Sequence, residues 1–86
     1  MTTETATAFT MYSTPWCGYC HRLKSQLERE GIEFEMVDIE QHPEHVETVE
    51  QANGGNQTVP TLLYRDGSTQ TNPSVAQVKE KLASLA

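Results

Sequence analysis

The sequence predicts an α/β fold in which three helices flank a four-stranded mixed sheet, in the order βαβαββα. Short segments of alternating apolar and polar residues are separated by longer segments with helical periodicity. An Asp-Gly pair at 66–67 lies between two short strand-like segments, which is typical of an antiparallel hairpin. Because helix-linked strands come first and the hairpin last, we expect helices on both faces of a small sheet.

The first half of the chain contributes a strand, a helix and a second strand. Residues 8–12 alternate in character and end before Pro15, which predicts a strand. Residues 18–30 are rich in helix-forming residues and precede Gly31, a common helix stop. Residues 32–39 alternate again and predict a second strand with a buried end. The helical positions expected to face inward are Tyr19, Cys20, Leu23 and Leu27.

The second half contributes a helix, the hairpin and a final helix. Pro43 suits the first turn of a helix that we expect to cover residues 43–52. Residues 61–64 and 68–71 are the two hairpin strands. The Asn-Pro pair at 72–73 is expected to cap and begin the last helix. The apolar stripe of this helix is Val75, Val78, Leu82 and Leu85.

Length and composition describe a small acidic domain. The chain of 86 residues is expected to form one domain at 8–86 behind a disordered polar tail at 1–7. A net charge of −6 and scattered basic residues disfavour nucleic acid and anionic membranes as partners. No apolar run approaches the ~20 residues of a membrane span, and the first residues do not resemble a secretory signal. We therefore expect a cytoplasmic monomer.

The two cysteines, Cys17 and Cys20, form a C-x-x-C motif at the start of the first helix. A helix N-terminus presents free N–H groups and the positive end of the helix dipole, which favour a thiolate. Cys17 lies nearest this end and is the expected nucleophile, because only the thiolate attacks a disulfide. Cys20, one turn further on, is the expected resolving thiol. A structural disulfide is disfavoured, since so small a loop constrains the unfolded chain little.

Three neighbours of this pair are candidate substrate contacts. Gly18 leaves backbone room for a substrate close to Cys17. Tyr19 offers an aromatic wall and a hydroxyl, or is an ordinary exposed aromatic on a helix. Trp16 either shields the reactive thiol or covers the core.

A second stretch, Thr58-Val59-Pro60, precedes the hairpin. A proline that introduces a strand beside a reactive pair is a candidate for a cis peptide bond, although only ~5–6% of X-Pro bonds in folded proteins are cis. We expect the Val59-Pro60 bond to be cis and Val59 to face Cys17. The backbone of Val59 would then be free to pair with a substrate.

A metal site is the first alternative for the cysteines. A zinc module would combine Cys17 and Cys20 with two of His21, His42 and His45. The spacing differs from that of the familiar finger, in which ~12 residues separate the second cysteine from the first histidine. The redox function is therefore favoured, and the histidines are expected to be surface residues.

Four stretches together resemble a known family: "STPWCGYC", "VDIE", "NGGNQTVPT" and "DGSTQTNPS". They are similar to the glutaredoxin-like proteins of the thioredoxin superfamily, and more narrowly to the mycoredoxins, which work with mycothiol. The resemblance covers the chain after residue 7 and implies a thioredoxin/glutaredoxin fold. It implies Cys17 as nucleophile and Cys20 as second thiol. It also implies that the walls of the thiol site are Tyr19, Thr58, Val59 and Pro60.

The resemblance implies a thiol-disulfide oxidoreductase that reduces protein-mycothiol mixed disulfides with mycothiol as co-substrate and no tightly bound cofactor. Its partners would be mycothiolated proteins and, indirectly, a mycothiol disulfide reductase. Residues 13–16 and 71–74 differ from the pattern common among glutathione-using relatives. Two alternatives stay open: a thioredoxin-like dithiol redoxin of the ribonucleotide-reductase type, reduced directly by a flavin reductase, and a glutaredoxin dimer that binds an iron-sulfur cluster.

Overall fold

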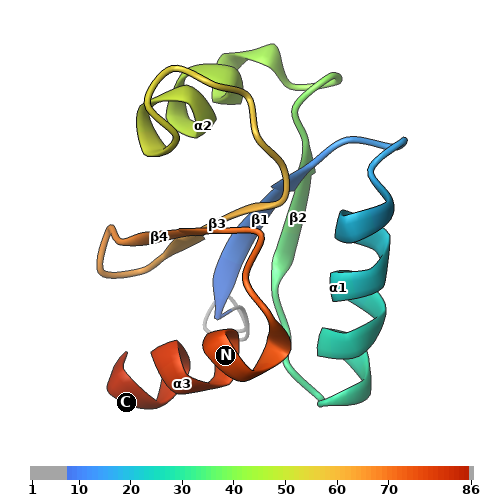
Figure 1. The fold of residues 1–86 in the computed structure, drawn as a ribbon, viewed down its shortest axis with the longest axis vertical. Coiled ribbons are helices and arrows are strands. Elements are labelled where there is room, and N and C mark those ends of the chain that lie inside the picture. The colour runs from blue at the N-terminus through green and yellow to red at the C-terminus, as the bar shows by residue number, and fades with distance from the viewer. Residues whose placement is uncertain (1–7, 86) are drawn as a thin grey trace, which may run out of the picture.

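The computed structural model describes residues 8–85 and has the expected order of elements (Figure 1). The tail expected at 1–7 lies outside the described residues. The strands and helices are β1 (Phe9–Ser13), α1 (Gly18–Arg29), β2 (Glu35–Asp38), η2 (Pro43–His45), α2 (Val46–Ala52), β3 (Thr61–Tyr64), β4 (Thr69–Thr71) and α3 (Val75–Leu85). The predicted α/β class, with a four-stranded mixed sheet and three α-helices, is confirmed.

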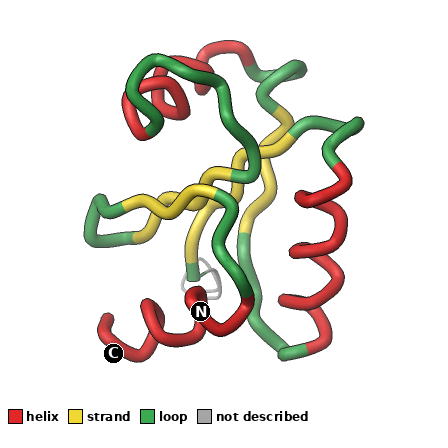
Figure 2. Tube along the Cα trace, in the orientation of Figure 1, coloured by secondary structure: helices red, strands yellow, loops and turns green. Residues whose placement is uncertain are grey.

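The sheet has the order β2-β1-β3-β4. β1 pairs in parallel with β2 and antiparallel with β3, and β3 pairs antiparallel with β4. The carboxyl ends of β1 and β2 and the amino end of β3 therefore lie at one edge of the sheet. Figure 2 shows the loops after β1 and β2 and the loop before β3 gathering at this edge.

Helices cover both faces of the sheet, because side chains alternate along each strand. Phe9 and Met11 of β1 face α1 and α3, in a core that includes Leu27 and Val78. Tyr12 faces the opposite side, where α2 covers the sheet. This second core consists of Tyr12, Ile39 and Val49 with Val37, Val46, Val59 and Leu63 packed against it.

Several boundaries differ from those predicted. β2 begins at Glu35 instead of residue 32, because its pairing with β1 runs only from Glu35 to Asp38. The helix expected at 43–52 begins as a 3₁₀ turn, in which the N–H of His45 donates to the carbonyl of His42. Tyr19 does not face inward with its helical neighbours, since it lies on the exposed side of α1.

The predicted start of α3 is also wrong, because the helix begins at Val75, two residues later than the sequence suggests. Ser74, not the Asn-Pro pair at 72–73, caps this helix. The N–H of Gln77 donates to Ser74 Oγ at 3.1 Å, and the N–H of Ser74 donates to Gln77 Oε1 at 2.9 Å. This reciprocal pair is a capping box with glutamine at its third position. Asn72 instead adopts a positive φ of 49°, which turns the chain from β4 into the helix.

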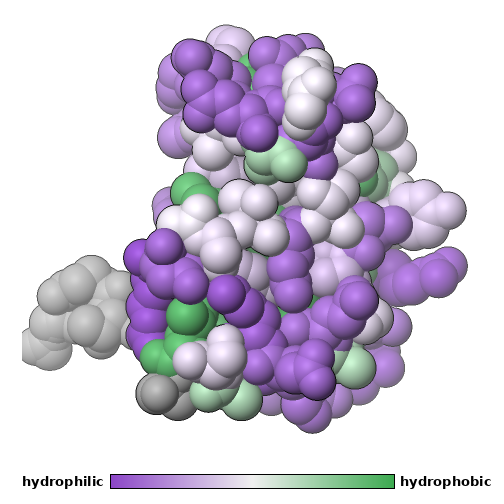
Figure 3. Space-filling view, turned by 60° about the vertical axis from the view of Figure 1, so that its left-hand side comes forward, coloured by the Kyte–Doolittle hydropathy of each residue, from purple (hydrophilic) through white to green (hydrophobic). Residues whose placement is uncertain are grey.

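Hydrophilic residues dominate the face shown in Figure 3, and hydrophobic residues form only small patches on it. Within residues 8–85, no helix is long and apolar enough to span a membrane.

Candidate active site

Cys17 occupies the N-cap position of α1, at the end of the loop that connects β1 to the helix. Its backbone is extended (φ −84°, ψ 106°), and its Sγ accepts a hydrogen bond from the backbone N–H of Cys20 at 3.1 Å. The N–H of Cys17 donates to the Thr14 carbonyl at 3.2 Å and closes the turn. The predicted position of Cys17 at the start of the helix is confirmed. An N–H donor and the positive end of a helix both favour negative charge on an atom held there.

Cys20 lies one turn into α1 and is completely buried. Burial above all, together with the hydrogen bond with Cys17 and the charge of that neighbour, raises the pKa of the Cys20 thiol to about 12. Cys17 is the more exposed thiol, as expected. Even so, only 5% of Cys17 is accessible, because the loop that carries Val59 lies against it. Both thiols are free in this structure.

The Thr58-Val59-Pro60 stretch lies directly across from Cys17. The Val59-Pro60 bond is cis, as predicted. The Cys17 thiol donates to the Val59 carbonyl, with 3.8 Å between Sγ and the oxygen, so the expected approach of Val59 to Cys17 is confirmed. Pro60 is buried, and its carbonyl accepts from the Asn72 N–H at 2.8 Å. Thr58 is exposed beside the thiol site.

Asn53 stabilises this stretch through side-chain hydrogen bonds, a role that the sequence did not suggest. Its Nδ2 donates to the Val49 carbonyl at 2.8 Å and to Thr61 Oγ1 at 2.9 Å, and its Oδ1 accepts from Thr71 Oγ1. Thr61 Oγ1 donates in turn to the Thr58 carbonyl at 2.7 Å. One side chain thus links the end of α2 to β3, β4 and the start of the Val59 loop. In the sequence, Asn53 is recognisable only as the first residue of a helix-ending run.

The two aromatic residues beside the cysteines point into solvent. Trp16 is 69% exposed and Tyr19 is 63% exposed, so neither covers the core. The Trp16 indole Nε1–H donates to Glu40 Oε2 at 2.7 Å, a contact that the sequence did not predict. Gly18 has open space around it, since a Cβ there would meet nothing within 4 Å. This space fits the expected room for a substrate close to Cys17.

Tyr19 lines one side of a pocket of about 290 Å³. The pocket lies between the first half of α1 and the segment that leads into α3. Its lining residues are Tyr19, Arg22, Leu23, Gln26, Asn72, Pro73 and Ser74. The side chains of Arg22, Gln26 and Asn72 give this pocket both hydrogen-bond donors and acceptors.

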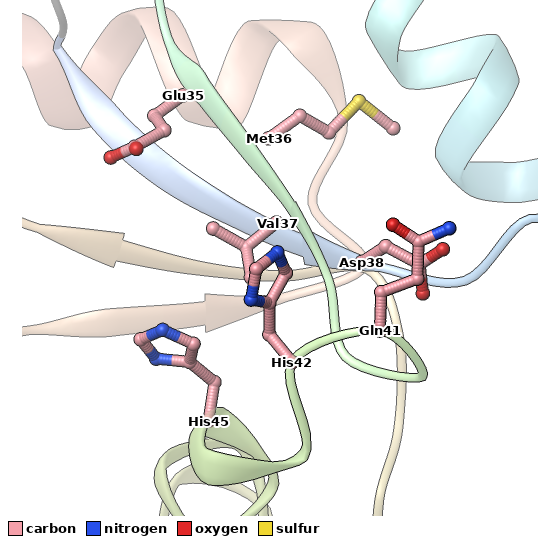
Figure 4. A pocket seen from close by; sticks show the side chains of 7 residues that line it. All are labelled: Glu35, Met36, Val37, Asp38, Gln41, His42 and His45. Atoms are coloured by element: carbon pink, nitrogen blue, oxygen red, sulfur yellow. The ribbon is translucent and has the colours of Figure 1, made fainter.

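The histidines do not converge on the cysteines. His42 and His45 line a different pocket of about 300 Å³ along the outer side of β2, with Asp38 nearby and neither cysteine in its lining (Figure 4). The His21 ring lies 2.8 Å from the Pro15 carbonyl. Within residues 8–85, no three histidine, cysteine or acidic side chains are grouped to hold a metal ion. The arrangement that a zinc module requires is therefore not present in this part of the chain.

The chain is similar to several known proteins. The glutaredoxin family model matches residues 9–68. A Mycobacterium tuberculosis protein described as a glutaredoxin is 52% identical over 79 residues, covering 92% of this chain and 94% of that protein. Mycoredoxin 1 of Corynebacterium glutamicum is 43% identical over 77 residues, covering 90% and 95%. The crystal structure of a glutaredoxin from Archaeoglobus fulgidus aligns with a TM-score of 0.70 and 26% identity, covering 86% of this chain and 84% of that one.

Proposed function

The chain belongs to the glutaredoxin family of redox proteins, and we propose that it reduces mixed disulfides between proteins and mycothiol, with Cys17 as the attacking thiol. One observation carries this proposal. Cys17 Sγ is held at a helix N-terminus, with the Cys20 N–H at 3.1 Å on one side and the Val59 carbonyl at 3.8 Å on the other. A thiolate formed there meets a substrate sulfur with the Cys20 N–H already in place as its hydrogen-bond donor.

The first exchange frees the protein thiol. The Cys17 thiol loses its proton, and the thiolate attacks the mycothiol sulfur of the mixed disulfide. A disulfide forms between Cys17 and mycothiol, and the protein leaves as a thiolate that takes up a proton. Loss of the Cys17 proton also releases the Val59 carbonyl, which becomes available to an N–H of the substrate.

The second exchange regenerates the protein. A free mycothiol thiolate attacks the mycothiol sulfur on Cys17, so Cys17 leaves as a thiolate and mycothiol disulfide is released. The net reaction consumes one free mycothiol, which joins the mycothiol of the mixed disulfide in one mycothiol disulfide, and the protein is released as a thiol. A separate mycothiol disulfide reductase would return electrons from NADPH. The proposed cycle takes place in the cytoplasm on a monomer.

Mycothiol is favoured over glutathione by two considerations. A relative that this chain resembles over most of its length is named a mycoredoxin. The pocket beside Tyr19 also offers Arg22, Gln26 and Asn72, polar side chains that suit the hydroxyl groups of a sugar-bearing thiol.

Turnover on one model protein carrying either mycothiol or glutathione tests the proposal. With excess free thiol of the matching kind, the mycothiolated protein should give the higher kcat/KM, and Cys17→Ser should abolish turnover. A preference for the glutathionylated protein would overturn the assignment to mycothiol. Activity that depends on a flavin reductase and not on either small thiol would favour the dithiol redoxin instead.

A further inference from the structure

The strand order gives Cys17 different surroundings on its two sides, which are called here the β2 flank and the β3 flank. β1, which leads to Cys17, is flanked by β2 on one side and β3 on the other. Val59 lies just before β3, and Glu40 lies just after β2. Tyr19 and its pocket extend toward the Asn72 segment, whose N–H is bonded to Pro60 next to Val59. The β3 flank therefore offers a concave pocket lined by both polar and apolar side chains, and the β2 flank offers Trp16.

Trp16 is fixed by a chain of contacts that begins in the sheet. Asp38 ends β2, and its Oδ1 accepts from the Glu40 N–H at 2.9 Å. Glu40 Oε2 then accepts from the Trp16 indole N–H at 2.7 Å, across 24 positions of sequence. A charged acceptor makes this bond stronger than one between neutral groups. An indole that is 69% exposed would otherwise be free to change rotamer.

We propose that Glu40 is a positioning residue that holds the Trp16 indole as a wall on the β2 flank of Cys17, where it contacts the protein half of the mixed disulfide. This inference rests on the proposed function. The small thiol fits the concave pocket on the β3 flank, since compact ligands bind in pockets. The protein half then covers the other flank. Exposed tryptophan is among the residues that contribute most to protein contacts.

Fluorescence tests the positioning directly, because Trp16 is the only tryptophan in the chain. Glu40→Ala removes the acceptor and should lower the steady-state anisotropy of Trp16 and shift its emission. Glu40→Gln keeps an oxygen acceptor at the same reach and should restore most of the wild-type signal. The matched control is Glu80→Ala, which removes an exposed glutamate of α3. If Glu40→Ala and Glu80→Ala give the same wild-type spectrum and anisotropy, Glu40 does not hold Trp16 and the proposal is overturned.

Enzyme kinetics test whether Trp16 contacts the protein half of the mixed disulfide. Two substrates are used, a mycothiolated protein and a mixed disulfide of mycothiol with a small thiol. Glu40→Ala should raise the KM for the protein substrate about fivefold more than the KM for the small one, the size expected for loss of one solvent-exposed hydrogen bond. Trp16→Phe should give a similar ratio. The double variant should be no worse than Trp16→Phe alone, because Glu40 acts through Trp16.

Equal KM changes for the two substrates, or fully additive effects in the double variant, would overturn the proposal. Its failure can be told apart from failure of the proposed function. If the wild-type protein turns over glutathionylated but not mycothiolated protein, the mycothiol assignment fails. The KM ratio is then measured on glutathione mixed disulfides, where the same fivefold difference is required.

Discussion

Replacement of Cys20 by serine separates the two mechanisms available to a pair of cysteines. In the proposed cycle only Cys17 attacks, and its sulfur is supported by the backbone N–H of Cys20 at 3.1 Å. Any side chain at position 20 except proline keeps that N–H. Cys20→Ser should therefore retain turnover on protein-mycothiol mixed disulfides, while Cys17→Ser should lose it.

The structure sets the size of both effects. Burial raises the pKa of the Cys20 thiol to about 12, so Cys20 is protonated at pH 7 while Cys17 reacts, and free mycothiol in excess resolves the Cys17 intermediate without it. We expect Cys20→Ser to keep mixed-disulfide turnover within about twofold of wild type and Cys17→Ser to lose at least about 10³-fold. A buried serine hydroxyl without a partner costs about 1–3 kcal/mol of stability. Cys20→Ala, which adds no hydroxyl, is the matched control for folding.

The assay compares the variants on two substrates with mycothiol in excess. One is a mycothiolated protein, and the other is a protein with an intramolecular disulfide, which Cys20 must attack to release the target from Cys17. Cys20→Ser should fail only on the second substrate. Thermal unfolding checks that both Cys20 variants are folded at the assay temperature. If folded Cys20→Ser and Cys20→Ala are inactive on the mixed disulfide, the single-thiol mechanism is refuted.

Three further predictions concern stability. Leu27→Ala, at a completely buried position of α1, should lower the free energy of unfolding in urea by about 2–5 kcal/mol, and a loss below ~1 kcal/mol would contradict the assigned core. Ser74→Ala should cost about 0.5–2 kcal/mol, because it removes the acceptor for the Gln77 N–H, while Ser74→Asp should retain most of the stability. Hydrogen bonds from Ser68 lower the pKa of Asp66 to about 2, so Asp66 contributes stability above its unfolded pKa of ~3.9 and loses it as the pH falls through about 2. Asp66→Asn should therefore be less stable than wild type at pH 7, and the difference should shrink as the pH falls from about 4 through about 2; a difference that does not depend on pH would contradict this.

The sequence predicted the features that depend on neighbours along the chain. Alternation in β1 placed Phe9 and Met11 on one face and Tyr12 on the other, as the two cores show. Spacing and helix propensity placed Cys17 at the start of a helix, and the structure puts it at the N-cap. The cis bond before Pro60 was also predicted, but from the order of elements and not from local preference, which favours trans.

Local pattern was less able to set the ends of elements. The expected cap of α3 at 72–73 was wrong because two capping signals lie next to each other, Asn-Pro and then Ser74 with Gln77 three residues on. The second signal sets the start of the helix, because the side chains of Ser74 and Gln77 each accept a hydrogen bond from the other's backbone N–H. Tyr19 fits the helical stripe in the sequence but is exposed in the structure, where it lines a pocket together with Asn72 and Pro73.

The sequence by itself determined the fold class, the reactive pair and its place on a helix end, because periodicity, turn residues and the C-x-x-C spacing are short-range properties. The approach of Val59 to Cys17 across 42 positions was also expected, from the proline and the order of elements. Only the tertiary structure decided the other contacts around the site, in which Glu40 reaches Trp16 across 24 positions and Asn53 bonds Thr71 across 18. These contacts exist because the order β2-β1-β3-β4 brings the ends of several strands to one edge of the sheet. Polar pairs of this kind leave no periodic signal, so their partners follow from strand order and not from the local pattern of residues.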